Sequence, residues 1–281
     1  LGLTVMQNTD YQTVIETLLN AMRNKPHGID IRAGSETWPI AMEAAKDPKA
    51  TAQSELKRCV DSEAGLIYLR GDGTLVCEAR NTRAGDAVPA HEIIDTMQEA
   101  DPERSTNQII NRVEVTVYPR KVDASPTTLL YSLDQPLAIG NGIESNISLD
   151  YRDPVNVSTK IGGLDVATPI AVTDYAINTL EDGTGIDVTS EVTLVKTWIP
   201  ESNAMRLVIQ NNYGGQVYFT TLNIYGRGVY NYAPTTLLAE DLDSIDDDGV
   251  HEEAYSMPYQ GSGPVGESVG QLFLAQYAAL P

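Results

Sequence analysis

The sequence predicts an α+β protein: a helix-plus-hairpin α+β part, an inserted all-β sandwich or barrel-like domain, and a C-terminal helix. Three observations predict this class. Helical periodicity is confined to the two ends of the chain. Two apolar runs flank Gly71-Asp72-Gly73, as in a tight hairpin. Between Pro119 and Tyr232, short strand-like runs recur without a convincing helix.

The first expected helix spans residues 9–23. Its apolar residues recur at helical spacing: Tyr11, Val14, Ile15, Leu18 and Met22. Thr9 and Gln12 have the spacing of a capping box, so Thr9 is the expected N-cap.

The second expected helix spans residues 47–63, with Asp47 as N-cap and Pro48 at the first helical position. Its apolar stripe consists of Ala52, Leu56, Cys59 and Val60. Cys59 and Cys77 match neither a metal-binding spacing nor a disulfide framework. Because cysteine is often buried, both are expected to be small buried thiols.

A hairpin follows, with strands at 66–69 and 74–80. Both Gly71 and Gly73 are expected to have a positive φ in its turn. Residues 109–118 then alternate between apolar and polar side chains, which predicts a further strand.

The middle of the chain is expected to be all β. Its strand-like runs are 129–133, 147–151, 167–177, 189–198, 205–210 and 216–225, with turns at Asp182-Gly183 and Gly214-Gly215. After residue 232 the character is mixed, and Pro264 precedes a last helix. The apolar stripe of that helix consists of Val265, Val269, Leu272, Phe273 and Leu280. The expected organisation is therefore 1–118, 119–232 and 233–281, with the last segment packing on the first part.

Charge limits the choice of partners. The chain has 39 acidic and 19 basic residues, a net charge of −20, and residues 233–281 hold nine acids and no base. A duplex-binding surface needs clustered Lys and Arg, so no specific nucleic-acid binding is expected. No run of 18 apolar residues exists, so no membrane insertion is expected. Residues 1–9 do not have the pattern of a signal peptide.

Two serine motifs are candidate catalytic sites. Residues 266–270 match G-x-S-x-G around Ser268, and residues 54–57 match S-x-x-K. Both fall in expected helices rather than after a strand, and the histidines His27, His91 and His251 are scattered. We therefore expect no enzyme activity, no cofactor, and no catalytic or metal-ligating residue. A hydrolase that uses Ser268 or a carboxylate pair is the less favoured alternative.

The acidic run from Asp241 to Asp248 contains five aspartates. It lacks the register and the bidentate Glu of an EF-hand, so an exposed acidic loop is expected rather than a calcium site.

Tyrosine is unusually frequent: there are 14 Tyr against two Phe and two Trp. Tyr combines apolar area with a polar tip, which suits subunit interfaces and carbohydrate platforms, whereas cross-strand packing is the plainer use. The candidate interaction residues are Tyr213, Tyr218, Tyr230 and Tyr232. An exposed platform of these rings would favour a carbohydrate- or receptor-binding β-sandwich module, which is the main alternative function.

Four stretches, taken in order, resemble tail-tip proteins of tailed bacteriophages and prophages, the baseplate-hub or tail-associated structural family. They are 61–80, 110–117, 205–212 with 217–226, and 255–259 with the helix to Tyr277. They are similar to that family's helix-end and hairpin, the following strand, the closing strands of a sandwich, and the concluding helix.

The resemblance implies a structural protein of the virion tail tip, assembled in the bacterial host cytoplasm. It implies partners of three kinds: copies of the chain itself, as a trimer of the full-length protein, other tail-tip or tube proteins, and tape-measure proteins. Family hubs adapt the hexameric tail tube to the tip, and the resemblance carries over no catalytic residue. The acidic balance would suit a tube lumen through which DNA slides.

Overall fold

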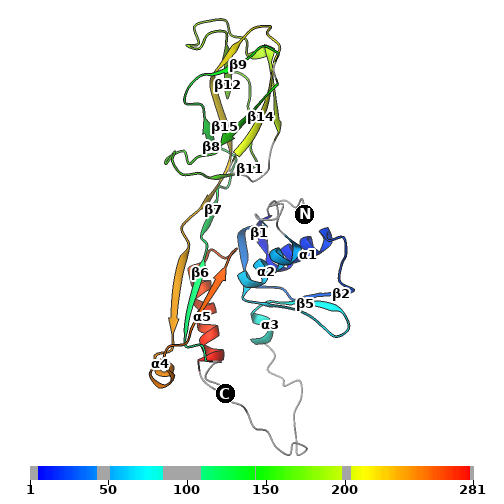
Figure 1. Cartoon of the computed structure of the whole chain (residues 1–281), viewed down its shortest axis with the longest axis vertical. Helices are drawn as coiled ribbons and strands as arrows, with labels where there is room; N and C mark the ends of the chain where they lie inside the picture. The colour runs from blue at the N-terminus through cyan, green and yellow to red at the C-terminus, as the bar shows by residue number, and fades with distance from the viewer. Residues whose placement is uncertain (1–5, 43–50, 85–108, 143, 198–203, 279–281) are drawn as a thin grey trace, which may run out of the picture. The chain divides into compact units, whose positions relative to one another are not determined.

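A computed structural model describes residues 6–42, 51–84, 109–142, 144–197 and 204–278. The α+β class predicted from the sequence is confirmed. Contacts divide the chain into a discontinuous unit, residues 1–119 with 232–281, and an inserted unit, residues 120–231. The expected boundaries at 118/119 and 232/233 each lie one residue away from these (Figure 1).

The first half of the discontinuous unit combines helices with two small sheets. Its helices are α1 (Tyr11–Ala21), α2 (Ala52–Glu63) and the short α3 (Asn81–Ala84). Its strands are β1 (Met6–Asp10), β2 (Gly28–Ile31), β3 (Thr37–Ala41), β4 (Leu66–Leu69) and β5 (Thr74–Glu78). β1 pairs with β3, and the second sheet has the order β2–β5–β4. The apolar faces of α1 and α2 meet in a core around the fully buried Trp38.

Both helices start later than predicted. Asp10 caps α1, and its carboxylate accepts a hydrogen bond from the Thr13 N–H at 2.8 Å, while Thr9 belongs to β1. Thr51 caps α2 through a reciprocal capping box with Ser54, so the prediction of Asp47 as its N-cap is wrong. Asp47 and Pro48 lie outside the described residues. Several residues able to cap precede each apolar stripe, and side-chain spacing alone does not select among them.

The predicted hairpin is confirmed as β4 and β5. Gly73 has φ +83°, and the Asp72 carboxylate accepts a hydrogen bond from the Thr74 N–H at 2.9 Å. Gly71 does not have a positive φ, so the expectation of two left-handed glycines is wrong for it. One left-handed residue is enough because Gly71 and Asp72 are the central residues of a turn closed by the Gly73 N–H on the Arg70 carbonyl, and only Gly73, at its end, has a positive φ.

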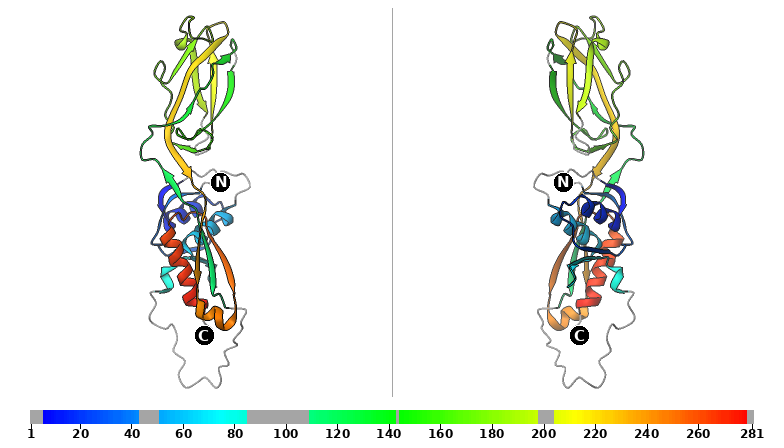
Figure 2. Two further views of the ribbon diagram at one scale, coloured as in Figure 1. Left: turned by 90° about the vertical axis from the view of Figure 1, so that its left-hand side faces the viewer. Right: turned by 90° about the vertical axis from the view of Figure 1, so that its right-hand side faces the viewer.

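The second half of the discontinuous unit is a three-stranded sheet with a helix on one face. The strand order is β16 (Thr235–Glu240), β6 (Arg112–Val117) and β17 (Glu252–Met257), with β17 parallel to β6. Helix α5 (Gly263–Tyr277) packs along β6 and β16, as both views in Figure 2 show. The expected loop at 241–248 is instead helix α4 (Leu242–Asp248). Asp241 caps it by accepting a hydrogen bond from the Ser244 N–H at 3.0 Å.

The buried face of α5 contains part of the predicted apolar stripe, since Val265 and Phe273 pack against the core that includes Val269, and it adds two glycines. Val269 and Leu274 are buried, together with Gly266 and Gly270. A Cβ at Gly266 would lie 2.7 Å from Leu237 Cδ1, and one at Gly270 would lie 2.9 Å from Ala239 Cβ. The two glycines therefore let the helix lie close to the sheet, a role that hydrophobic periodicity does not reveal. Leu280 lies outside the described residues.

In its described residues the inserted unit consists of strands and one short 3₁₀ helix, Thr189–Glu191. The strands are β7 (Arg120–Val122), β8 (Thr128–Ser132), β9 (Leu137–Ile139), β10 (Glu144–Asp150), β11 (Gly162–Leu164), β12 (Tyr175–Asn178), β13 (Val192–Thr197), β14 (Ala204–Asn211) and β15 (Val217–Asn231). One sheet has the order β10–β14–β13, and in the other β15 pairs with β7, β8, β9, β11 and β12. Apolar side chains from both sheets form one core, to which Leu207 and Phe219 contribute.

Three predicted strands of the inserted unit have clearly different starts or ends. The run 189–198 begins as the 3₁₀ helix Thr189–Glu191 and becomes a strand only at β13. The run 167–177 becomes a strand only at β12, because Val172 has φ +71° and the Asp174 carboxylate accepts a hydrogen bond from the Ile170 N–H. β15 continues to Asn231, well past the expected end at Tyr225. Its later half pairs with β7, β8 and β11, and only the fold reveals these partners.

Candidate functional site

The four tyrosines named from the sequence are not gathered at one place. Tyr213 lies in the turn after β14, while Tyr218 and Tyr230 lie on β15. These two residues are twelve positions apart on the strand, which at about 3.3 Å per residue is at most roughly 40 Å along it. Tyr232 belongs to the discontinuous unit.

Two of these tyrosines have local structural partners. The Tyr230 hydroxyl donates to an Asp123 carboxylate oxygen at 3.2 Å, and the Lys121 ammonium lies 5.1 Å from the Tyr230 ring centre. The Tyr218 hydroxyl accepts a hydrogen bond from the Gln216 amide at 2.9 Å. Tyr213 and Tyr232 are 40% and 53% exposed, and they are the two of the four most open to a partner.

The serine motifs lie on helices. Ser268 is exposed on α5, in a helical turn rather than after a strand. Ser54 is used by the capping box of α2, and Lys57 pairs with Asp61 at 2.9 Å. His27 is exposed, and His251 contacts the Asp248 carbonyl at 3.1 Å, while His91 lies outside the described residues.

No group of three His, Cys, Asp or Glu side chains able to hold a metal ion occurs among the described residues. Within the same residues, no helix combines the length and apolar character needed to cross a bilayer. Cys59 and Cys77 are both free and buried, as expected, and burial raises the pKa of the Cys77 thiol to about 11.

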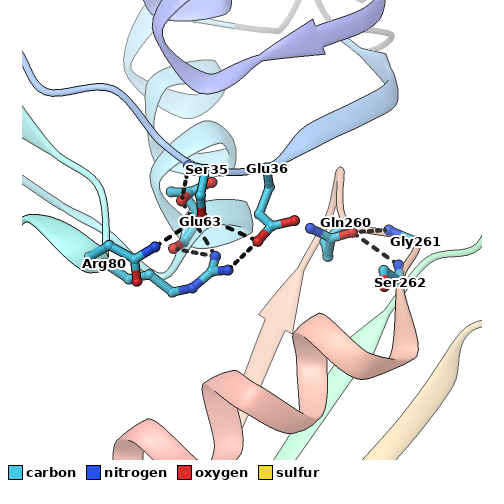
Figure 3. A network of polar contacts seen from close by, with 8 residues as sticks. Ser35, Glu36, Glu63, Arg80, Gln260, Gly261 and Ser262 are labelled. Atoms are coloured by element: carbon cyan, nitrogen blue, oxygen red, sulfur yellow. Dashed lines mark hydrogen bonds and ion pairs between the residues drawn. The ribbon is translucent and has the colours of Figure 1, made fainter.

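The discontinuous unit contains a buried ionic network (Figure 3). Arg80, from the end of the hairpin, contacts Glu36 at 2.5 Å and Glu63 at 3.4 Å. The Glu63 side chain is fully buried and also accepts a hydrogen bond from the Ser35 N–H at 3.4 Å. The Arg80 side chain is only 7% exposed, so its guanidinium group faces these carboxylates rather than solvent.

Burial has a large effect on Glu63. Loss of hydration raises the pKa of its carboxyl group to about 7, although Arg80 and the Ser35 N–H act in the opposite direction. A second buried carboxylate, Glu55, accepts a hydrogen bond from the Tyr259 hydroxyl. Burial raises the pKa of Tyr259, so this hydroxyl keeps its proton and remains a donor.

Next to this network is a cavity of about 310 Å³, here called the aromatic pocket. Its lining residues come from α2, β4, β5, β17 and α5: Asp61, Ala64, Gly65, Leu66, Glu78, Ala79, Arg80, Tyr255, Leu272, Phe273, Gln276 and Tyr277. The rings of Tyr255 and Phe273 are 5.1 Å apart, and those of Phe273 and Tyr277 are 6.2 Å apart. Three rings and two carboxylates therefore face one space.

The shape of the pocket depends on the backbone just after α2, which lies very close to the backbone of β5. Ala64 ends the helix with φ +52°, and a Cβ on Gly65 would collide with the Glu78 carbonyl oxygen. Leu66 then pairs with Glu78 across the hairpin. The segment 61–80, which carries the first part of the family resemblance, thus supplies Asp61, Glu78 and Arg80 to the pocket.

Sequence reasoning missed the network and the pocket. One signal was present in α2: Glu63 continues the stripe of Leu56 and Val60 at helical spacing, and a charged residue in an apolar stripe indicates a buried partner. No comparable signal links Arg80 to Glu36, which is 44 residues away.

Comparison with known proteins identifies no family for the chain. No protein-family model matches it, and neither the curated proteins nor the solved structures include a match.

Proposed function

We propose that this protein is a structural component of a phage or prophage tail tip, similar to a baseplate hub, and that it acts by assembly. Its partners would be copies of itself, as a trimer of the full-length protein, together with other tail-tip, tube or tape-measure proteins. Virion localisation is part of the same proposal. The resemblance of four ordered segments motivates it, and one feature of β4 carries it further.

Strand β4 is an apolar edge strand. In the sheet β2–β5–β4 it pairs only with β5 among the described strands, so its other edge presents backbone N–H and C=O groups. Its sequence is Leu-Ile-Tyr-Leu, and Leu66, Tyr68 and Leu69 are 44%, 39% and 67% exposed. Edge strands of monomeric proteins are usually protected by charge, proline or a bulge within the strand. An apolar strand with a free edge favours pairing with another chain, which is the chemistry of assembly.

A carbohydrate- or receptor-binding module is the second candidate. The inserted unit has a cavity of about 370 Å³ between β8 and β10, lined in part by Tyr131, Asp134, Asp150 and Arg152. An aromatic ring with carboxylates and a guanidinium group could hold a polyhydroxylated ligand. This observation favours a glycan more than the scattered Tyr213, Tyr218, Tyr230 and Tyr232 do.

The test measures the mass of the full-length protein by light scattering at low and moderate salt. We expect a closed ring, most simply a trimer, strengthened by moderate salt because screening reduces repulsion between acidic copies. Leu69→Lys should shift the protein toward monomer. The matched control is Leu242→Lys on α4, which should leave the mass unchanged, because Leu242 is similarly exposed, at 69% against 67% for Leu69.

A full-length protein that stays monomeric at high concentration in both buffers would remove the hub assignment and leave the binding module as the leading candidate. Equal effects of Leu69→Lys and Leu242→Lys would remove β4 from the interface.

A further inference from the structure

We propose that the aromatic pocket binds the side chain of a lysine or arginine from a partner protein. The proposal rests on the assembly function in identifying the ligand as part of a partner, and it adds the chemistry by which that partner is recognised. Three features of the pocket lead to it: its aromatic wall, its carboxylates and its position beside β4.

The aromatic side of the pocket can pack against the methylene groups of a long side chain. Tyr255, Phe273 and Tyr277 form a continuous series of rings, and Leu66 and Leu272 add apolar surface. Lysine and arginine carry three or four methylene groups that pack well on such surface while the charged end seeks polar partners. Ring faces also attract a cation within about 6 Å.

The charge in the pocket is negative. Asp61 and Glu78 both line it, against one guanidinium group, that of Arg80. The Tyr68 hydroxyl donates to Glu78 at 3.0 Å, and the ammonium of Lys57 reaches Asp61 at 2.9 Å from a side chain that is 73% exposed. Lys57 contacts both carboxylate oxygens of Asp61, so a ligand cation at Asp61 would share that carboxylate with Lys57.

Among the described residues of the lining Arg80 is the one base, and it does not make the pocket attractive to anions. Its guanidinium group lies between Glu36 and Glu63, and its side chain is 7% exposed. These three side chains together carry no net positive charge. A cationic ligand therefore matches the pocket better than an anionic one.

The position of the pocket and the charge of the chain point to a protein partner. Leu66 belongs both to β4 and to the pocket lining, so a strand added at the edge of β4 would bring its own side chains to the pocket. The chain has a net charge of −20, which steers basic segments of other proteins toward it.

The experiment uses small probes and NMR spectra of the full chain. n-Butylammonium and n-butylguanidinium stand in for the two side chains, n-butanol is the neutral control, and butyrate is the anionic control. We expect the cations to shift the ring signals of Tyr255 and Phe273 and to bind about fivefold to tenfold more tightly than n-butanol, because charge and cation–π attraction add to apolar contact. Butyrate should bind most weakly.

Variants separate the parts of the site. Glu78→Gln and Asp61→Asn should each reduce cation binding several-fold while leaving n-butanol binding unchanged. Phe273→Leu should weaken both probes. The matched control is Asp243→Asn on the exposed helix α4, which should change nothing. Circular dichroism of each variant verifies folding, and Asp61→Asn, at a partly exposed position, keeps the test valid if Glu78→Gln fails to fold.

Equal binding of n-butanol and n-butylammonium, or tighter binding of butyrate, would overturn the cation site. So would cation binding that is unchanged in both Glu78→Gln and Asp61→Asn. Failure of the two proposals can be told apart. If the protein assembles but the pocket rejects cations, only the cation site falls. If the pocket binds cations while the full-length protein stays monomeric, only the hub function falls.

Discussion

The two units bury different kinds of polar groups. Within the described residues, the buried polar side chains of the inserted unit are neutral: Asn178, Thr189 and Asn211. The discontinuous unit buries the carboxyl groups of Glu55, Glu63 and Glu78, together with the nearly buried Arg80. The inserted unit is stabilised by an apolar core and by neutral hydrogen bonds at its turns. The discontinuous unit also has charged side chains buried in its core.

This difference predicts how the stability of each unit should respond to pH and to substitutions that remove charge. A neutral amide that bonds turn carbonyls has a stabilising effect that hardly varies with pH. A buried carboxylate costs free energy to ionise, and the loss of its partner leaves that cost uncompensated. The discontinuous unit should therefore be the more sensitive of the two to pH and to charge-removing substitutions.

The largest expected effect comes from Arg80→Met. This change removes the guanidinium group that lowers the Glu63 pKa, so at pH 8 the buried carboxyl must either take up a proton or stay ionised without its partner. The discontinuous unit should lose about 3–5 kcal/mol of unfolding free energy. Hydrogen exchange measured by mass spectrometry follows peptides of both units in one experiment. The control is Arg152→Met in the inserted unit, where the exposed guanidinium group donates to the Val157 carbonyl and little loss is expected. Similar losses from the two variants would contradict the comparison.

The next effect is a pH dependence confined to the discontinuous unit. Because the pKa of Glu63 is raised to about 7 from an ordinary value of 4.5, the folded unit holds a proton that the unfolded chain has released. Stability should therefore fall as pH rises from about 4.5 to 7, by about 3 kcal/mol in total. Denaturant titrations at several pH values, read by unit-specific hydrogen exchange, measure it. Glu63→Gln should flatten the profile, and a profile that rises over this window would refute the assignment.

A smaller effect on stability is expected when a buried neutral hydrogen-bonding side chain of the inserted unit is removed. Asn211 is 1% exposed, and its amide donates to the Gly140 and Gly215 carbonyls at 3.0 and 2.7 Å. Asn211→Ala should cost the inserted unit about 2 kcal/mol at any pH from 5 to 8, because it leaves those carbonyls without their donor. The neighbouring Asn212→Ala, at an exposed position, is the matched control for the thermal melts. A cost that varied strongly with pH would break the contrast between the units.

The smallest effect should be the same in both units, because it concerns turns rather than cores. Gly73 and Gly214 have φ of +83° and +90°, in the discontinuous and inserted units respectively. Replacing either with Val should cost about 1 kcal/mol or more, since a β-branched residue resists positive φ. Gly71→Val is the control, because Gly71 lacks a positive φ and a Cβ there meets open space. An unchanged melting temperature for Gly73→Val would contradict the turn assignment.

Local sequence pattern predicts an element correctly where the interactions that form it are between residues close in sequence. The hairpin at 66–80, the strand that became β6 and the helix after Pro264 follow from alternation, helical spacing and turn residues. The first residues of the helices are harder to predict, because other residues able to cap a helix lie close to Asp10 and Thr51 in the sequence. The acidic run at 241–248 is predicted as a loop but forms helix α4, with Asp241 as its N-cap.

The candidate site could not be predicted in the same way. The aromatic pocket joins side chains from residues 61–80 with others from residues 255–277, and the ionic network joins Glu36 to Arg80. The one signal in the sequence is the position of Glu63 on the apolar stripe of α2, which indicates a buried partner for its carboxylate. The tyrosines Tyr213, Tyr218, Tyr230 and Tyr232 drew attention by their number, but their spacing on the fold depends on the length of β15.

The sequence by itself determined the α+β class, the hairpin, and the acidic character of the chain, because composition and short-range periodicity are properties of neighbouring residues. Tertiary structure alone decided which carboxylates are buried, which guanidinium group neutralises them, and which rings face Asp61 and Glu78. The physical reason is that burial and pairing depend on residues brought together from distant parts of the chain. No window of local sequence contains both members of such a pair.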